Sequence, residues 1–120
     1  MINKDVLKLK NGEFFTGTIK FLNGLKIWYM NGKIHRDNDL PAIEYSNGRK
    51  DWYLNGLCHR INGPAIIHCH GSKEWWLNGE LHRENGPACE WDNGTKYWYL
   101  NGKKLSEKEW KQKVEMRTNE

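Results

Sequence analysis

The sequence is poor in apolar residues and has no long apolar run. Only 38% of its 120 residues are hydrophobic, and no stretch approaches the roughly 18 consecutive apolar residues of a membrane-spanning helix. We therefore expect no transmembrane segment and no thick globular core. A chain of this length is expected to form one domain, so we treat residues 1–120 as a single unit.

Cysteines and targeting signals are sparse as well. The chain has three cysteines, and the residues after Met1 do not resemble a secretory leader. A disulfide framework in a secreted domain normally uses an even number of cysteines. The odd number indicates free thiols in a reducing compartment, so we expect a cytoplasmic protein.

Strong charge and recognisable catalytic motifs are also missing. The net charge is +4 and the basic residues are dispersed, unlike the dense basic footprint of a dedicated nucleic-acid-binding domain. The glycines follow turn rules and form no phosphate-binding loop, and no serine lies on a strand–turn–helix elbow. We expect neither an enzyme nor a bound cofactor.

What the sequence does contain is repetition. The segment 52–65 recurs closely at 75–88, a looser copy runs over 28–42, and a truncated copy begins at Trp98. The leading tryptophans are spaced 24, 23 and 23 residues apart, and the longer step reflects one inserted residue between Asp37 and Pro41. Such a period predicts stacked supersecondary units.

Asn-Gly dipeptides predict where the chain turns. They occur at 11–12, 23–24, 31–32, 47–48, 55–56, 78–79, 93–94 and 101–102, with His70-Gly71 in the equivalent place of one copy. We assign them two-residue type I′ turns, the commonest hairpin connection for Asn-Gly. The turn at 55–56 then pairs Tyr53 with Cys58 and Trp52 with His59. The turns at the other end of each copy pair Ile19 with Trp28, Ile43 with Trp52, Ile66 with Trp75 and Cys89 with Trp98.

Strand alternation then separates two faces. The tryptophan face carries Trp28, Trp52, Trp75 and Trp98 with Met30, Leu54, Leu77 and Leu100, and we predict that it is buried. The opposite, tyrosine face carries Tyr29, Tyr53, Trp76 and Tyr99. Between these aromatics the alternation places Asp51 and Glu74 together with Arg36, Arg60 and Arg83.

Arginine, tyrosine and tryptophan are enriched in interface hot spots, so these four aromatics and three arginines are our candidate partner-binding residues. The same combination could stack the bases of a single-stranded nucleic acid. The alternative is structural: each arginine pairs with a carboxylate and lies over an aromatic ring.

The two ends differ from the repeats. Residues 1–27 form a degenerate half-unit, residues 28–105 the repeats, and residues 106–117 a capping helix. Ser106 is a good N-cap, Glu109 completes a capping box, and Leu105 and Trp110 are spaced as a hydrophobic staple. The predicted fold is all-β: an array of antiparallel meanders or hairpins in one twisted sheet or open solenoid. The C-terminal helix is expected to cover the last open strand.

Two groups of residues could suggest a metal site. One histidine per copy (His35, His59, His82) repeats without a second ligand type, which favours hydrogen-bonded structural histidines. The cluster His68-Cys69-His70, with Cys58 and Cys89, has metal-like composition but lacks paired ligand spacing. We therefore predict no metal site.

A unit of 23 residues with aromatic-x-Asn-Gly-x-x-His and a second glycine turn resembles the MORN (membrane occupation and recognition nexus) repeat. The matching residues are Trp52, Asn55, Gly56, His59 and Gly71 with their equivalents, over about residues 17–105. The family's His-Gly is His-Arg here, and the Gly-Pro-Ala corner is foreign to it, as in MORN-variant repeats of small phage and viral proteins. The resemblance implies stacked β-hairpins that serve as a protein scaffold.

These observations predict a non-catalytic binding protein. We expect a small phage- or virus-type protein that docks on a host protein in the host cytoplasm and inhibits or recruits it. Lys103, Lys104 and Lys108 add a basic edge. One alternative is binding of RNA, single-stranded DNA or a nucleotide through the aromatic and arginine face. A second is attachment to anionic lipid or a scaffold, and a homodimer through an edge strand is a further expectation.

Overall fold

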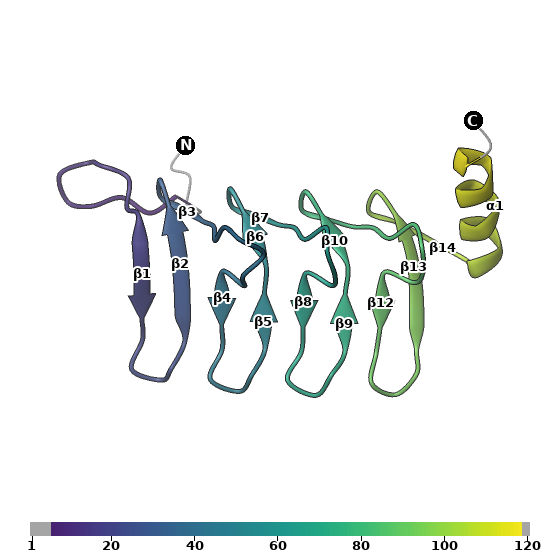
Figure 1. Cartoon of the computed structure of the whole chain (residues 1–120), viewed down its shortest axis with the longest axis horizontal. Coiled ribbons are helices and arrows are strands. Elements are labelled where there is room, and N and C mark those ends of the chain that lie inside the picture. The colour runs from purple at the N-terminus through teal and green to yellow at the C-terminus, as the bar shows by residue number, and fades with distance from the viewer. Residues whose placement is uncertain (1–5, 119–120) are drawn as a thin grey trace.

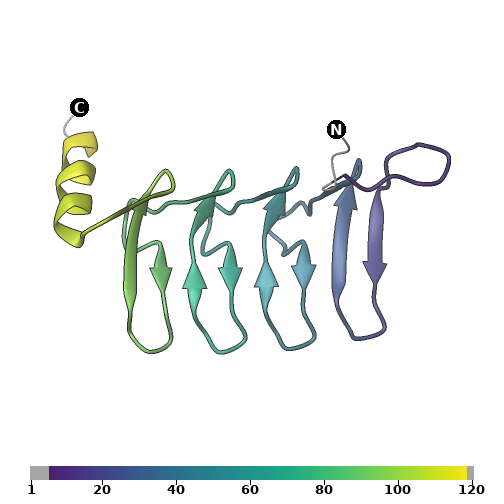
Figure 2. The same cartoon turned by 180° about the vertical axis from the view of Figure 1, so that it is seen from behind.

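In a computed structural model, residues 6–118 form an elongated ten-stranded antiparallel sheet, two small two-stranded sheets and a helix at the C-terminal end. The molecule measures 52 × 32 × 28 Å. Seen from either side, no second layer covers the sheet (Figures 1 and 2). The predicted all-β repeat fold with one C-terminal helix is confirmed, in its single-sheet form.

The strands form four main hairpins side by side and a row of small hairpins along the upper edge in Figure 1. The main hairpins are β1 (Gly17–Lys20) with β2 (Lys26–Met30), β4 (Ile43–Glu44) with β5 (Lys50–Asp51), β8 (Ile66–Ile67) with β9 (Lys73–Glu74), and β12 (Cys89–Glu90) with β13 (Lys96–Leu100). The small hairpins pair β2 with β3 (Lys33–Ile34), β6 (Tyr53–Leu54) with β7 (Leu57–Cys58), β10 (Trp76–Leu77) with β11 (Glu80–Leu81), and β13 with β14 (Lys103–Leu105).

Two kinds of Asn-Gly turn alternate along the chain. At the upper edge Asn55 and Gly56 have φ of 51° and 80°, as a type I′ turn requires, and the turns at 31–32, 78–79 and 101–102 share this pattern. At the lower edge only the glycine has positive φ, which is 97° at Gly48. There the Asn47 side chain accepts the Arg49 N–H at 3.0 Å, and Gly48 N–H donates to the Tyr45 carbonyl. The lower turns are thus three-residue loops, and our assignment of two-residue turns there was wrong.

The extra loop residue shifts the register by one and changes what flanks each tryptophan. Ile43 pairs with Asp51 rather than Trp52, and Ile19, Ile66 and Cys89 pair with Ile27, Glu74 and Tyr97. Trp52 lies instead between Ala42 and Ala65, both of which are fully buried. A methyl group leaves room for an indole to lie across the strand. The pairing of Tyr53 with Cys58, set by a type I′ turn, is confirmed.

Burial is shared between the two faces. On the tryptophan face Trp52 and the alanines are buried, whereas Met30 is exposed and the other three leading tryptophans are half-buried. On the tyrosine face Ile43, Ile66 and Cys58 are buried, and Tyr53 and Trp76 pack against them. The prediction of one dry face was wrong, because a single sheet has no second layer to cover either side.

Hydrogen bonds along the upper edge hold neighbouring copies together. His35 Nδ1 accepts the Asn55 N–H at 2.8 Å, and His59 and His82 bind Asn78 and Asn101 in the same way at 2.9 Å. Each histidine therefore fixes the type I′ turn of the next copy. The predicted hydrogen-bonded role of these histidines is confirmed, and the unprotonated Nδ1 assigns the tautomer that carries its proton on Nε2.

Helix α1 (Glu107–Thr118) begins with the predicted capping box. Ser106 Oγ accepts the Glu109 N–H at 3.1 Å, and the Glu109 carboxylate accepts the Ser106 N–H at 3.0 Å. Leu105 and Trp110 share a buried cluster with Leu100, as the staple predicts. The helix lies beside β13 and β14 (Figure 1). Among the described strands, Lys96 and Tyr97 of β13 pair with β12 alone, so this part of the last strand keeps an uncovered edge.

Within the described part of the chain, α1 is the only helix, and it is too short and too polar to cross a membrane.

Candidate functional site

The three candidate arginines lie on the tryptophan face, not among the tyrosines. The guanidinium groups of Arg36, Arg60 and Arg83 stack on Trp28, Trp52 and Trp75 at 3.8, 3.9 and 3.7 Å from the ring centroids. Strand β7 ends at Cys58, so the alternation that predicted the opposite face no longer applies to Arg60. The structure therefore separates the arginines from the aromatics with which we had grouped them.

Each arginine also donates hydrogen bonds to acceptors in its own neighbourhood. All three donate to the carbonyl of the following proline corner at 3.1 Å. Arg36 and Arg83 also bind Glu44 and Glu90, at 3.3 and 3.1 Å. Cation–π contact and hydrogen bonds together make these side chains covers for the indoles, which is the structural alternative we had kept open.

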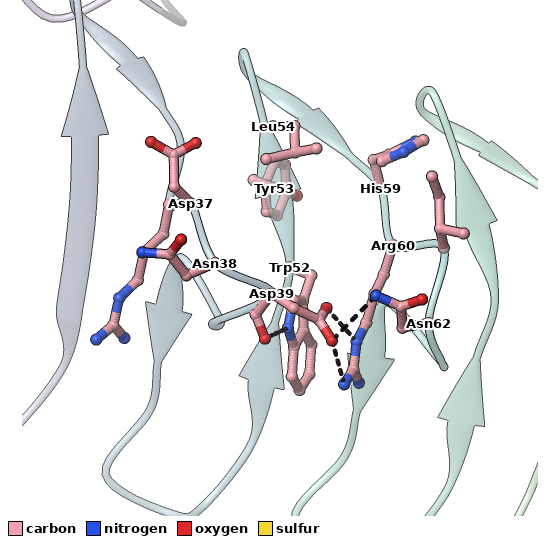
Figure 3. A pocket seen from close by; sticks show the side chains of 11 residues that line it. Asp37, Asn38, Asp39, Trp52, Tyr53, Leu54, His59, Arg60 and Asn62 are labelled. Atoms are coloured by element: carbon pink, nitrogen blue, oxygen red, sulfur yellow. Dashed lines mark hydrogen bonds and ion pairs between the residues drawn. The ribbon is translucent and has the colours of Figure 1, made fainter.

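A pocket of about 230 Å³ lies on this face between the first two copies (Figure 3). The inserted residue of the first copy supplies one wall, since Asp39 binds Arg60 at 2.9 Å through its carboxylate and Trp52 Nε1–H through its carbonyl at 3.1 Å. Asn38 and Asp39 both have positive φ, 67° and 55°. This backbone conformation brings the Asp39 carbonyl to the Trp52 indole N–H. The hydrogen bond from Arg60 lowers the pKa of Asp39. Because the polar groups of Asp39, Arg60 and Trp52 are hydrogen-bonded to one another, we interpret the pocket as a structural contact between the first two copies.

An equivalent pocket of about 300 Å³ recurs one copy further on. Its lining includes Trp75, Leu77, Arg83 and Ile61. Ile61 stands where the first pocket has Asp37, and Glu84 and Asn85 stand where it has Ile61 and Asn62. Neither pocket brings together a nucleophile, a base and an unpaired donor, the set that hydrolytic chemistry needs.

The tyrosine face keeps the four candidate aromatics in one column. Tyr29, Tyr53, Trp76 and Tyr99 are each half-buried at successive copies. Burial raises the pKa of Tyr53 to about 12. Trp76 is fixed by a hydrogen bond from its Nε1–H to Glu74 at 3.0 Å. Within this column, Tyr53 is therefore packed and Trp76 is held in one orientation.

A second aromatic column on the same face was missed by the sequence analysis. Phe21, Tyr45, His68 and Trp91 begin the lower loops of successive copies, directly before the three-residue turns. The Tyr45 hydroxyl donates to Asp51 at 3.4 Å, which places it on the tyrosine face. The signal was present, since each lower Asn-Gly or His-Gly follows a ring by two residues.

Between the two columns lie two carboxylates, Asp51 and Glu74, each held by hydrogen bonds. Asp51 is 2% exposed and receives two hydrogen bonds from Arg49, at 2.9 and 3.1 Å. This pairing raises the pKa of Arg49. Glu74 binds His68 and Trp76. A buried charge is tolerated only when it is paired, so these contacts order the middle of the face.

Free thiols occur at Cys58, Cys69 and Cys89. Burial raises the pKa of Cys58 to about 12 and that of Cys89 to about 11, so both are protonated at neutral pH. Among residues 6–118 no group of three or more His, Cys, Asp or Glu side chains is placed to hold a metal ion. Of the cysteines with metal-like composition in the sequence, Cys69 is exposed, whereas Cys58 and Cys89 are buried.

Comparison with known proteins finds no matching family model, no matching curated protein and no matching solved structure. The assignment of a function therefore depends on the two faces of this sheet.

Proposed function

We propose that this chain is a non-catalytic binding protein that docks on a partner protein with its tyrosine face. The observation that carries the proposal is the pair of aromatic columns on one uncovered side of the sheet. Tyrosine and tryptophan contribute much contact area with few rotatable bonds, which makes them effective interface anchors.

Rigidity supports the same conclusion. Asp51 and Glu74 hold Arg49, His68 and Trp76 by hydrogen bonds, so little side-chain entropy remains to be lost on binding. The columns run along the 52 Å axis of the molecule. This surface suits a partner with an extended flat contact area rather than a small ligand.

The nature of the partner follows from the resemblance to MORN-variant repeats of phage and viral proteins. It supports a host protein, inhibited or recruited by this chain, and a cytoplasmic location. The arginines that we first assigned to the interface contribute to the scaffold in this proposal, since they cover Trp28, Trp52 and Trp75.

Photo-crosslinking tests the proposed face without destabilising it. The photoreactive residue p-benzoylphenylalanine is placed at Tyr53 or Tyr99, and the matched controls carry it at Ile61 or Met116, which are 79% and 67% exposed. In lysate of the host cell, we expect one protein to be crosslinked from both tyrosine positions and from neither control.

Crosslinking of the same proteins from the tyrosine positions and from the control positions would contradict the proposal. A Tyr53→Ala/Trp76→Ala variant with an unchanged circular dichroism spectrum should then bind the identified partner at least tenfold more weakly. Unchanged affinity would equally contradict a contact through this face.

A further inference from the structure

A row of five lysines crosses the tryptophan face at a single register position. Direct strand pairing joins Lys20 to Lys26, Lys50 to Glu44 and Ile67, and Lys96 to Glu90. We call the lysines of this line the lysine row: Lys20, Lys26, Lys50, Lys73 and Lys96. The row passes through eight strands, a length of about 34 Å at about 4.8 Å between neighbours.

The positive charge of this row is only partly balanced, because two glutamates lie among five lysines. The intervening glutamates, Glu44 and Glu90, turn away from the lysines to bind Arg36 and Arg83. Within residues 6–118 no carboxylate comes within 4.0 Å of any of the five lysine amines. At the centre, Ile67 occupies the place that glutamate has in the neighbouring copies, so Lys50 and Lys73 have no acid between them.

The row also contains a direct repulsion. Lys20 and Lys26 are opposite each other on β1 and β2. Like charges at directly opposed positions destabilise a sheet. An anion lying across the row would relieve this cost and would replace the missing carboxylates.

We propose that the lysine row binds the phosphate backbone of a single-stranded nucleic acid. An extended strand offers phosphates along its whole length, so each flexible lysine can reach one. In a duplex, the two backbones are separated by the grooves, and the major groove alone is about 12 Å wide. A straight row of lysines would therefore contact a duplex backbone only where a strand passes the edge of a groove. The neighbouring indoles are covered by arginine, so bases have no free ring to stack on and the contact is sequence-independent.

This site is distinct from the proposed protein-binding face. Glu44 binds Arg36, which stacks on Trp28, so the row belongs to the tryptophan face. Arg36, Arg60 and Arg83, the cations that the sequence had suggested for nucleic acid, are already occupied. The proposal of a partner protein on the tyrosine face and the proposal of a nucleic-acid strand on the lysine row can therefore be tested independently.

The test is fluorescence anisotropy with a labelled oligo(dT) of about 20 nucleotides, measured between 50 and 200 mM salt. Neutralising five phosphates predicts a slope of log K against log salt of about −3.5, which is roughly a 100-fold loss of affinity over this range. The variant Lys26→Gln/Lys50→Gln/Lys73→Gln/Lys96→Gln should reduce the slope to about −0.7, since one lysine of the row remains.

The matched control is Lys10→Gln/Lys108→Gln/Lys111→Gln/Lys113→Gln, which removes the same charge from exposed positions outside the row and also brings the net charge from +4 to zero. We expect the control to keep the slope, and the row variant to keep its melting temperature because a repulsion is removed. Equal losses in both variants would overturn the site, as would no binding at 50 mM salt. Tighter binding of a 20-base-pair duplex, or equal binding of polyglutamate, would overturn the choice of ligand.

Discussion

At the C-terminal end of the sheet Trp110 packs against Trp98, with ring centroids 4.6 Å apart and the ring planes tilted by 50°, whereas at the N-terminal end the outer edge of β1 has no neighbour among the described residues. The interior copies explain the first arrangement. Each interior tryptophan is covered by the arginine of its own copy, but the fourth copy has Ser106 in that place. The helix brings Trp110 into the vacant position.

Among residues 6–118, the N-terminal end has no such substitute. Leu22 is fully exposed, and Phe14, Leu9 and Phe21 are 53%, 46% and 45% exposed. These residues lie above and below a β1 edge whose Thr18 and Lys20 backbone groups point outward, because Phe21 and Leu25 are a hydrogen-bonded pair. Within residues 6–118, the C-terminal end of the array is thus partly covered by a helix, whereas the β1 edge at the other end stays open.

The largest expected effect is at the closed end. Trp110→Ala should lower the free energy of unfolding by about 3 kcal/mol, since it removes a buried indole and the hydrogen bond from Trp110 to the Arg83 carbonyl. Urea unfolding followed by circular dichroism measures the change. The control is Met116→Ala on the same helix, where we expect less than about 0.5 kcal/mol because Met116 is exposed. Equal effects would show that the helix does not close the array.

An interior copy should be less sensitive. Arg60→Ala leaves Trp52 without its cover and removes the hydrogen bond to the Pro64 carbonyl, for an expected loss of about 1 to 2 kcal/mol. The same unfolding measurement applies. A loss larger than that of Trp110→Ala would reverse the comparison, and no loss at all would mean that covering an indole is energetically unimportant here.

The open end should associate with a second copy through β1. In an antiparallel pair of β1 edges, Thr18 would oppose Lys20 of the other copy and Ile19 would oppose its own equivalent. Leu22→Glu should weaken association about tenfold by placing charge beside that edge, an effect of about 1.4 kcal/mol. Sedimentation velocity over a concentration series measures it.

Ile61→Glu is the control for this change, since Ile61 is also an exposed apolar side chain but lies in the interior of the array. In a Cys69→Ser background, Ile19→Cys should form an intermolecular disulfide under mild oxidation. A chain that stays monomeric at every concentration, or an Ile61→Glu variant that loses association to the same extent, would contradict a β1 contact.

The smallest effect is a difference in thiol reactivity between the middle and the closed end. At pH 8 alkylation should modify exposed Cys69 first, because the raised pKa values of Cys58, about 12, and Cys89, about 11, leave very little thiolate. Trp110→Ala should accelerate modification of Cys89, which lies in the last hairpin, more than that of Cys58. Mass spectrometry of alkylated peptides gives the rates. Equal rates at all three cysteines in the native protein would be incompatible with the described burial.

The local features of the fold could be predicted because they depend on neighbouring residues. Asn55-Gly56 was correctly given a type I′ turn, and Ser106 with Glu109 a capping box. The same dipeptide at Asn47-Gly48 forms a different turn. Leucine precedes Asn55 and serine precedes Asn47, but this difference gave no usable signal, because leucine also precedes Asn23, whose turn follows the lower pattern.

The candidate site was harder to predict because its parts come from separate copies. The Tyr29, Tyr53, Trp76 and Tyr99 column was found, since it follows from alternation within a strand. The position of Arg60 was missed, because the chain leaves the sheet after Cys58 and the guanidinium returns over Trp52. The lysine row was also missed, since the register that aligns it depends on the length of the lower loops.

By itself the sequence determined the number of copies, the positions of the turns and the closure by a helix, because each is encoded within a few consecutive residues. Only the tertiary structure decided which face the arginines cover, which carboxylates remain for the lysines and which strand edge stays open. Those outcomes depend on contacts between residues about one repeat apart, such as His35 with Asn55, and a one-residue change in a loop moves every side chain of a strand to the other face.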